Sequence, residues 1–358
     1  MQGYLNYRIA KWLLVVILLT TVLILSVCAC GTTPPAITLP PETVTITLPP
    51  ETVTITLPPE TVTITLPSET VTITLPSETV TITPVPALPP SEPAPVTFPD
   101  ANLETTIREA IDKPGGLIYT SDLESITVLE ALERGISDLT GLEYFLNLQE
   151  LSLSTNNISN ISPLAGLSNL EILALTYNDV SDISPLAGLS NLQVLYLGGN
   201  NISDISPLIG LNSLEVLGLG GSNISDISPL AGLSNLKGLY LSTNNISDIS
   251  ALAGFSNLEE LSLGSNNISD ISALAGLSNL EELYLYDNFI SDISVLTGLT
   301  NLRWLYLDIN SISDISALVD NTGLLDGDTV DLSGNPLSAE SISNYIPHLE
   351  ARGVNVRY

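Results

Sequence analysis

Aromatic side chains recur in a regular pattern towards the C-terminal end of this chain. Tyr284 and Tyr306 hold the same place in successive copies of a repeated phrase, and Trp304 stands two positions before Tyr306. Tyrosine and tryptophan bury large areas while keeping a polar group at one end, so they dominate the energetics of binding surfaces. This pattern predicts a partner-binding surface rather than a reaction centre. The predicted partner-binding residues are Tyr196, Tyr240, Tyr284, Tyr286, Trp304 and Tyr306.

A column of aspartates is the second set of side chains that could do chemistry. If the copies stack as neighbouring strands, their carboxylates would lie about 5 Å apart and could attract divalent cations. Each aspartate also precedes a short turn that its carboxylate can cap. Capping is the preferred interpretation, because no copy concentrates the oxygen ligands that calcium needs. No metal and no cofactor is expected. The column comprises Asp182, Asp204, Asp226, Asp248, Asp270, Asp292 and Asp314.

Catalytic chemistry finds no support in the sequence, and no catalytic residue is assigned. The single histidine, His348, is expected to pack near the C-terminus, and no phosphate loop, metal motif or nucleophile elbow is present. Asn-Ile-Ser triplets match glycosylation sites but arise from the repeated phrase. The formal net charge of −30, from 39 acidic and 9 basic residues, repels nucleic acids and anionic lipid headgroups. Nucleic-acid binding is therefore excluded.

The elements that position these side chains come from one repeated unit. A leucine recurs at every 22nd position from Leu148 to Leu302 without a slip, and each of these leucines opens the same phrase. Such a unit is too short to bury its own apolar face, so neighbouring copies must stack on it and the two ends need caps. The expected product is a rod with long faces.

The repeated phrase Leu-x-x-Leu-x-Leu-x-x-Asn resembles that of the leucine-rich repeat family. The segment Ile202 to Leu208, Ile-Ser-Asp-Ile-Ser-Pro-Leu, further resembles the repeats of bacterial internalins and their surface relatives. The resemblance covers about residues 97–358. It implies an α/β solenoid with a parallel concave β-sheet, short 3₁₀ or helical convex returns, and helical caps. It also implies a non-catalytic module that binds a protein partner on its concave face.

An asparagine column supports the stacking independently. A buried amide just past each strand can bond backbone groups of its own and the adjacent repeat. Ser222 replaces the asparagine in one repeat and is expected to make a weak rung. The column comprises Asn156, Asn178, Asn200, Asn244, Asn266, Asn288 and Asn310.

The two ends of the repeat region are predicted to be caps. Asp100 precedes Leu103, Ile107 and Ile111, which are spaced like one helix face. Ser338 can cap a last helix, which the strand-like segment 354–356 follows. The expected boundaries are 97–139 for the N-terminal cap, 140–322 for the repeats and 323–358 for the C-terminal cap.

The N-terminal segment 1–30 is predicted to be an export signal. Arg8 and Lys11 precede an apolar run from Trp12 to Val27, which is short for a membrane span. Ala29-Cys30 then resembles a bacterial lipobox, with Cys30 as the lipidated residue. Cleavage before Cys28 and an uncleaved anchor helix are the alternatives. The expected location is the extracytoplasmic bacterial surface, with the membrane contacted only through this lipid.

Residues 31–96 are predicted to be a stalk. A nine-residue phrase, Pro-(Pro or Ser)-Glu-Thr-Val-Thr-Ile-Thr-Leu, repeats with its prolines interrupting each strand-like stretch. Such composition favours an extended, semi-stiff spacer in which no sheet can grow.

Two interpretations of the aromatic residues stay open. They form a binding patch rimmed by Glu260, Glu282 and Asp308, or a cross-strand stack that only stabilises the sheet. The ligand is a protein or, as the alternative, an envelope glycan, and a monomer is expected. The chain ends at Tyr358 without a wall-sorting signal. Glycines nearer the N-terminus are expected to leave a bare trough beside the patch: Gly198, Gly199, Gly218, Gly220 and Gly221.

Overall fold

The computed structural model describes residues 53–56, 61–65, 70–74, 79–82 and 95–358. The chain divides into two compact units, residues 1–90 and 91–358. The predicted signal segment 1–30, with Cys30, lies outside the described residues, as does much of the predicted stalk. Among the residues that are described, no helix is both long enough and apolar enough to cross a membrane.

Four copies of the nine-residue phrase form short strands in the first unit. The first strand pairs with the fourth and the second with the third, both antiparallel. The prediction that no sheet pairing would occur here is wrong for these copies. Each strand alternates threonine with valine or isoleucine, and the prolines fall between the strands, so no ladder donor is lost. The strands are β1 (Val53–Thr56), β2 (Thr61–Thr65), β3 (Thr70–Thr74) and β4 (Thr79–Ile82).

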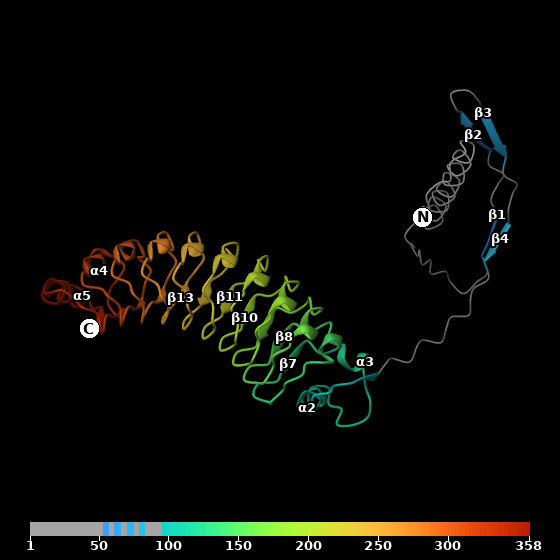
Figure 1. The fold of residues 1–358 in the computed structure, drawn as a ribbon, viewed down its shortest axis with the longest axis horizontal. Coiled ribbons are helices and arrows are strands. Elements are labelled where there is room, and N and C mark those ends of the chain that lie inside the picture. Colours follow the sequence, from blue (N-terminus) through green and yellow to red (C-terminus); the bar gives the residue numbers. More distant parts are fainter. Residues whose placement is uncertain (1–52, 57–60, 66–69, 75–78, 83–94) are drawn as a thin grey trace. The chain divides into compact units, whose positions relative to one another are not determined.

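An 11-stranded parallel sheet forms one side of the second unit (Figure 1). Its strands follow chain order, and between β8 and β15 each residue pairs with its equivalent in the next repeat, as Leu195 does with Leu217. The strands are β7 (Val128–Glu130), β8 (Glu150–Ser152), β9 (Ile172–Ala174), β10 (Val194–Tyr196), β11 (Val216–Gly218), β12 (Gly238–Tyr240), β13 (Glu260–Ser262), β14 (Glu282–Tyr284), β15 (Trp304–Tyr306), β16 (Thr329–Asp331) and β17 (Asn355–Arg357).

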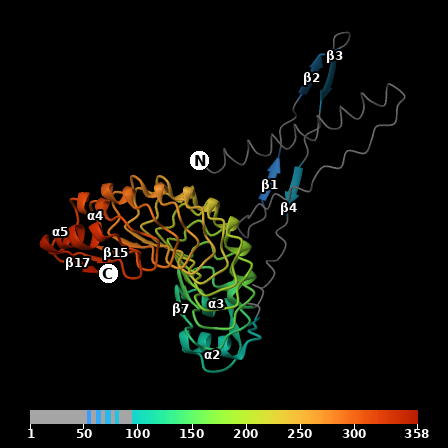
Figure 2. The ribbon, with the colours of Figure 1, turned by 60° about the vertical axis from the view of Figure 1, so that its left-hand side comes forward.

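Short helical turns return the chain between the strands. Figures 1 and 2 show these turns along the outer side of the curved unit and the strands along its inner side. The predicted solenoid, with a parallel concave sheet and 3₁₀ convex returns, is confirmed. The returns are η1 (Leu142–Tyr144), η2 (Ser162–Leu164), η3 (Ser184–Leu186), η4 (Ser206–Leu208), η5 (Ser228–Leu230), η6 (Ser250–Leu252), η7 (Ser272–Leu274), η8 (Ser294–Gly298) and the α-helical turn α4 (Ser316–Asp320).

The core is a continuous column of aliphatic side chains between sheet and returns. In β8 and the residue after it, Leu151 and Leu153 are buried whereas Ser152 is only partly covered. This alternation follows from the two-residue period of a strand, which sends successive side chains to opposite faces. The residue facing out of each strand is therefore free to vary.

The predicted asparagine ladder is confirmed, and Asn266 shows its bonding. Its Oδ1 accepts from the Ile246 N–H at 3.0 Å, and its Nδ2 donates to the carbonyls of Leu241 and Leu263, each at 3.0 Å. The weak rung is also confirmed. Among the described residues, the buried Ser222 hydroxyl has no hydrogen-bond partner, because serine is too short to bridge two repeats.

A second ladder on another side of the unit was not predicted. Asn257 Nδ2, for example, donates to the Ser234 carbonyl of the preceding repeat at 2.9 Å. Ser213 stands at the equivalent position of the repeat that contains Ser222. This repeat therefore lacks the asparagine of both ladders. The donors of this ladder are Asn147, Asn169, Asn191, Asn235, Asn257, Asn279 and Asn301.

The N-terminal cap contains helix α2 (Ala101–Ala110), which is the helix predicted after Asp100. Asp100 caps it by accepting from the N–H of Asn102 and of Leu103 at 2.9 and 3.0 Å. The second carboxylate oxygen accepts from the Ser137 N–H at 2.8 Å, which ties the helix to the first repeat. The cap also contains β5 (Pro95–Val96), paired antiparallel with β6 (Ile118–Tyr119), and α3 (Thr120–Leu123).

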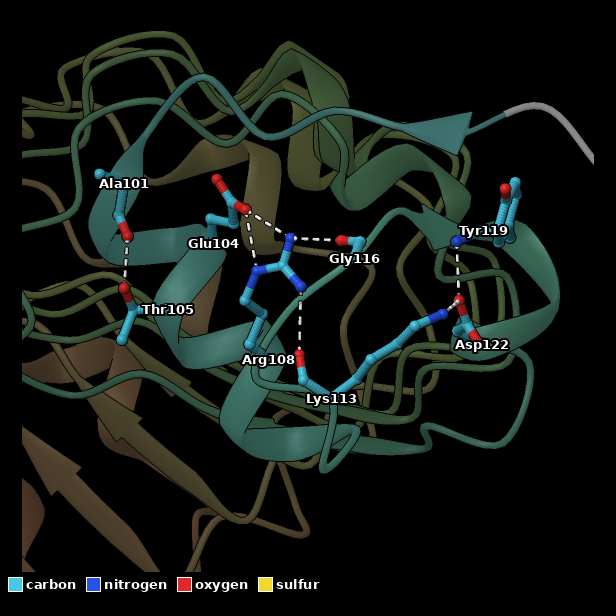
Figure 3. A network of polar contacts seen from close by, with 8 residues as sticks. All are labelled: Ala101, Glu104, Thr105, Arg108, Lys113, Gly116, Tyr119 and Asp122. Atoms are coloured by element: carbon cyan, nitrogen blue, oxygen red, sulfur yellow. Dashed lines mark hydrogen bonds and ion pairs between the residues drawn. The ribbon is translucent and has the colours of Figure 1, made fainter.

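Arg108 fastens the loop that leaves α2 (Figure 3). Its guanidinium pairs with Glu104 at 2.8 Å and donates to the carbonyls of Lys113 and Gly116 at 3.1 and 3.0 Å. Lys113 in turn pairs with Asp122 at 2.6 Å. These hydrogen bonds and ion pairs hold the loop between α2 and α3 in place, where few apolar side chains are available to pack it.

The C-terminal cap closes the other end of the core. Ser338 Oγ accepts from the Ser341 N–H at 3.1 Å where a π-helical turn, η9 (Ser341–Tyr345), leads into α5 (Ile346–Ala351). The predicted last helix and the strand after it, β17, are confirmed. His348 is exposed rather than packed, because it lies on the outer side of α5 with its Nδ1 2.8 Å from the Asn344 carbonyl.

Candidate functional site

The six predicted partner-binding residues lie on the outward face of the concave sheet. Tyr196 ends β10 and Tyr240 ends β12, while three others lie in β14 and β15. Tyr286 stands two positions past Tyr284 and alternates with buried Leu285, so it shares that face. The structure thus gathers four of them, Tyr284, Tyr286, Trp304 and Tyr306, at the C-terminal end.

Tyr284 and Tyr306 form a stacked pair. Their ring centroids are 5.0 Å apart and their planes meet at 8°. The pair follows from the sheet register, which sets these two residues directly opposite each other. Trp304, 40% exposed, lies opposite Glu282 in the same two strands. A stacked aromatic pair with acidic neighbours therefore lies on the concave side.

Two tyrosine hydroxyls bind glutamates on this face. Tyr284 Oη donates to Glu282 Oε2 at 2.7 Å, and Tyr240 Oη donates to Glu260 Oε2. Burial, reinforced by these hydrogen bonds, raises the pKa of both Tyr284 and Tyr240 well above the ordinary value. Both hydroxyls therefore stay protonated at physiological pH and hold their carboxylates in place. Two of the three predicted rim carboxylates, Glu260 and Glu282, are thus hydrogen-bonded to tyrosines of this face.

The predicted bare glycine trough is wrong. A Cβ at Gly218 would lie 2.8 Å from the Tyr196 ring, and one at Gly199 would lie 2.4 Å from the Tyr177 ring. Gly198 and Gly220 face the backbone of the next repeat at 3.0 Å. The glycines therefore make room for tyrosine rings and for close backbone packing.

Two exposed apolar residues in the turns after β14 and β15 were not singled out from the sequence. Phe289 is 61% exposed and Ile309 is 57% exposed. Ile309 has a φ of 54°, a left-handed conformation that strains a β-branched residue. Two other repeats have glycine at this position, Gly199 and Gly221, and none of the others has a β-branched aliphatic residue there. The sequence did hold a signal for Phe289. The equivalent position in the other repeats is asparagine, aspartate or serine, so an aromatic residue there departs from the pattern.

A cavity of about 460 Å³ lies next to the patch at the C-terminal end of the sheet. Tyr306, Asp331 and Arg357 line it together with residues of β16 and the chain around β17. Arg357 pairs with Asp331 at 3.2 Å. Burial and the neighbouring Asp331 raise the pKa of Asp308, which follows β15. The cavity at this end of the sheet thus holds one carboxylate paired with Arg357, that of Asp331, and a second one, that of Glu350.

The aspartate column bonds the start of the convex turns, from the position before the N-cap residue, which is an isoleucine such as Ile249. Asp248 Oδ1 accepts from the Ser250 N–H at 2.8 Å, and the same bond recurs in the other repeats. In the first regular repeat Asn160 makes this bond at 3.0 Å. Within the described parts of the chain, no group of three or more His, Cys, Asp or Glu side chains is placed to hold a metal ion.

We expect Asp248→Ala to lower the melting temperature and Asp248→Asn to preserve it at neutral pH, because Asn160 already makes the same bond. The hydrogen bond from Ser250 lowers the pKa of Asp248 below its ordinary 3.8. Because the pKa of Asp248 is lower in the folded than in the unfolded chain, its carboxylate stabilises the fold above about pH 4. This stabilisation is lost as the pH falls through the folded-state pKa. Melting curves from about pH 2.5 to 7 should show a smaller acid-induced loss in the asparagine variant. An equal loss in both proteins would contradict this assignment.

Comparison with known proteins agrees with this architecture. The family described as leucine rich repeats (2 copies) matches in overlapping windows that run from residue 146 to residue 320. The crystal structure of internalin C2 from Listeria monocytogenes is 38% identical, with a TM-score of 0.58, over 63% of this chain and 100% of that one. A second Listeria monocytogenes internalin is 32% identical, with a TM-score of 0.51, over 75% and 94%.

A more distant structure shares the fold alone. The leucine-rich repeat protein of Leptospira interrogans is 23% identical, with a TM-score of 0.61, over 67% of this chain and 62% of that one. A search of curated proteins gives no match. Proteins built from such repeats are in general non-catalytic binding modules, often for protein partners.

Proposed function

We propose that this chain, which belongs to the leucine-rich repeat family, is a surface-anchored binding protein that recognises another protein through the concave face of its repeats. The observation that carries the proposal is the stacked pair of Tyr284 and Tyr306 beside exposed Trp304. These rings lie on the side of the sheet that has no core to fill. Aromatic area held rigid before binding loses little entropy when a partner arrives.

The variation among repeats supports the same face. Residues that the fold needs, such as the buried leucines and the ladder asparagines, repeat with little change. The outward strand positions change from repeat to repeat, and aromatic residues gather in the last two regular repeats. Phe289 and Ile309 are further exposed apolar residues, in the turns that follow β14 and β15. Exposed apolar area of this kind is typical of a protein-binding site.

The rest of the chain supplies the anchor in this proposal. Residues 1–30 direct export, and Cys30 carries the lipid that holds the protein to the membrane. Residues 31–96 space the binding unit from that lipid. The cap at 97–139, the repeats at 140–322 and the cap at 323–358 then act as one monomeric binding unit. Labelling with a radioactive fatty acid, compared between the natural chain and Cys30→Ala, tests the anchor.

We expect the double substitution Tyr284→Ser and Tyr306→Ser to weaken capture of the partner at least about tenfold. The loss of the stack should cost only about 1 kcal/mol of unfolding free energy. The measurement is crosslinking of the chain to proteins of an envelope extract, followed by a urea denaturation curve for each variant. Loss of capture with retained stability is the expected pattern.

The matched control removes two tyrosines elsewhere, Tyr144→Ser and Tyr177→Ser, which are exposed but lie outside the aromatic patch. This control should capture the partner normally. If the Tyr284 and Tyr306 variant instead unfolds far more easily, the stack is a structural element of the sheet. If an array of envelope glycans is bound and no protein is captured, the carbohydrate-adhesive alternative replaces the protein partner.

A further inference from the structure

Every basic side chain of the second unit already has an acceptor. Five pair with a carboxylate of the unit at 2.6 to 3.2 Å, and Arg303 does so at 3.6 Å. Arg352 donates to the Val319 and Asn321 carbonyls. Because acidic residues greatly outnumber basic ones, most carboxylates are left without a cation from the chain itself. The paired residues are Arg108, Lys113, Arg134, Lys237, Arg303 and Arg357.

Two of these carboxylates lie side by side on the concave face. Glu260 in β13 and Glu282 in β14 are opposite each other in the sheet register, and both are half-buried. Within residues 95–358, neither has a basic side chain at ion-pair distance. Like charges directly opposite in a sheet destabilise it. The hydroxyls of Tyr240 and Tyr284 each bond one of the two carboxylates, but they carry no positive charge that would offset this repulsion.

The aromatic rings stand next to this pair. Tyr284 donates to Glu282, and its ring stacks on Tyr306 of the following strand. A guanidinium or ammonium group is attracted both to a carboxylate and to the face of an aromatic ring. Asp308, two residues past Tyr306, adds a further carboxylate. The cavity of about 460 Å³ beyond it is lined by Glu350 and by Asp331, which already pairs with Arg357. The chemistry of the face is therefore complementary to a row of cations.

We infer that the segment bound across β13, β14 and β15 is a basic stretch of the partner protein, with arginine or lysine side chains against Glu260, Glu282 and the Tyr284–Tyr306 stack. This inference rests on the proposed function and adds the chemistry of the partner. An arginine suits the site best, because its planar group can stack on a ring and bond a carboxylate at the same time.

The test uses the full chain in a mild non-ionic detergent and short fluorescent peptides that alternate arginine and glycine. In the control peptide, citrulline, a neutral group of the same shape, replaces each arginine. We expect fluorescence anisotropy to detect binding of the arginine peptide alone, with affinity falling as salt rises from about 50 to 300 mM. Glu260→Gln with Glu282→Gln should weaken this binding about tenfold.

The matched control is Glu130→Gln with Glu150→Gln, which removes two exposed carboxylates from β7 and β8 at the other end of the same sheet. It should change the affinity by no more than about twofold. If both double variants lose the same affinity for the arginine peptide, the binding reflects only the overall negative charge of the chain, and the inference is overturned. Equal binding of the citrulline peptide, or no peptide binding, would overturn it too.

These outcomes remain separate from the fate of the proposed function. If tyrosine-dependent capture of an envelope protein persists while the arginine peptide fails, the binding function stands and the partner segment is not basic. If both assays fail, both proposals fall.

Discussion

Asn266→Ala should lower the unfolding free energy by about 3 kcal/mol. Asn266 is 7% exposed, and its side chain bonds four backbone groups: the Ile246 N–H, the Gly264 carbonyl at 3.3 Å, and the two carbonyls of Leu241 and Leu263. The two carbonyls keep a second donor from neighbouring rungs, but the Ile246 N–H would be left buried and unpaired. Since each repeat depends on its neighbours, the loss acts on two repeats at once. The midpoint of urea denaturation, followed by circular dichroism, measures it.

The adjacent Asn267 supplies a matched control. Its side chain is exposed, and Asn267→Ala should change the unfolding free energy by less than about 0.5 kcal/mol. The reciprocal substitution, Ser222→Asn, should restore the missing rung and stabilise the chain by about 1 to 2 kcal/mol. Equal effects at Asn266 and Asn267, or no gain at Ser222, would show that the ladder contributes little.

Gly323→Ala should destabilise the C-terminal cap by about 3 kcal/mol or more. A Cβ at this position would lie 1.9 Å from the Thr300 carbonyl oxygen and 2.4 Å from its carbon. Both atoms are backbone, so no side-chain rotation relieves the clash. The Gly323 N–H also bonds buried Asn321 at 2.8 Å, and Asn321 in turn binds the Leu296 carbonyl. Movement of the glycine would therefore disturb the junction of the last repeat and its cap.

Gly232→Ala is the matched control for that substitution. No atom lies within 4 Å of a Cβ built there, and its backbone is not left-handed. We expect a change of less than about 0.5 kcal/mol, measured by the same denaturation curves. A similar loss at both glycines would mean that flexibility rather than the contact with Thr300 decides the effect.

The constant period of the repeats predicted the solenoid well because one pattern fixes several properties together. Alternation in Leu151, Ser152 and Leu153 predicts the strand, and the constant spacing predicts an in-register parallel sheet. The second asparagine ladder could not be predicted. Its members lie in a polar stretch where the sequence gives no sign that the side chain of Asn257 reaches the preceding repeat. The restriction at Gly323 likewise depends on a contact distant in sequence.

The candidate site was predicted less completely than the fold. The period placed Tyr284 and Tyr306 opposite each other, but the stacking geometry depends on side-chain rotamers. The glycine trough was wrong because a glycine in one repeat makes room for a ring from its neighbour, as Gly218 does for Tyr196. Aligning the repeats shows which residue type stands at each position. It does not show in which direction a long side chain such as that of Tyr196 points.

The uniform register of strands β8 to β15 has a consequence for how such a protein can evolve. Because partners across the sheet always hold equivalent places in neighbouring repeats, duplication or deletion of one whole repeat keeps every row and column aligned. A change of any other length would shift leucines and asparagines out of their columns. We expect natural variants to differ in length here by whole repeats. Recombination can then lengthen or shorten the concave face by whole repeats while the arrangement of Tyr284, Trp304 and Tyr306 at its C-terminal end is kept.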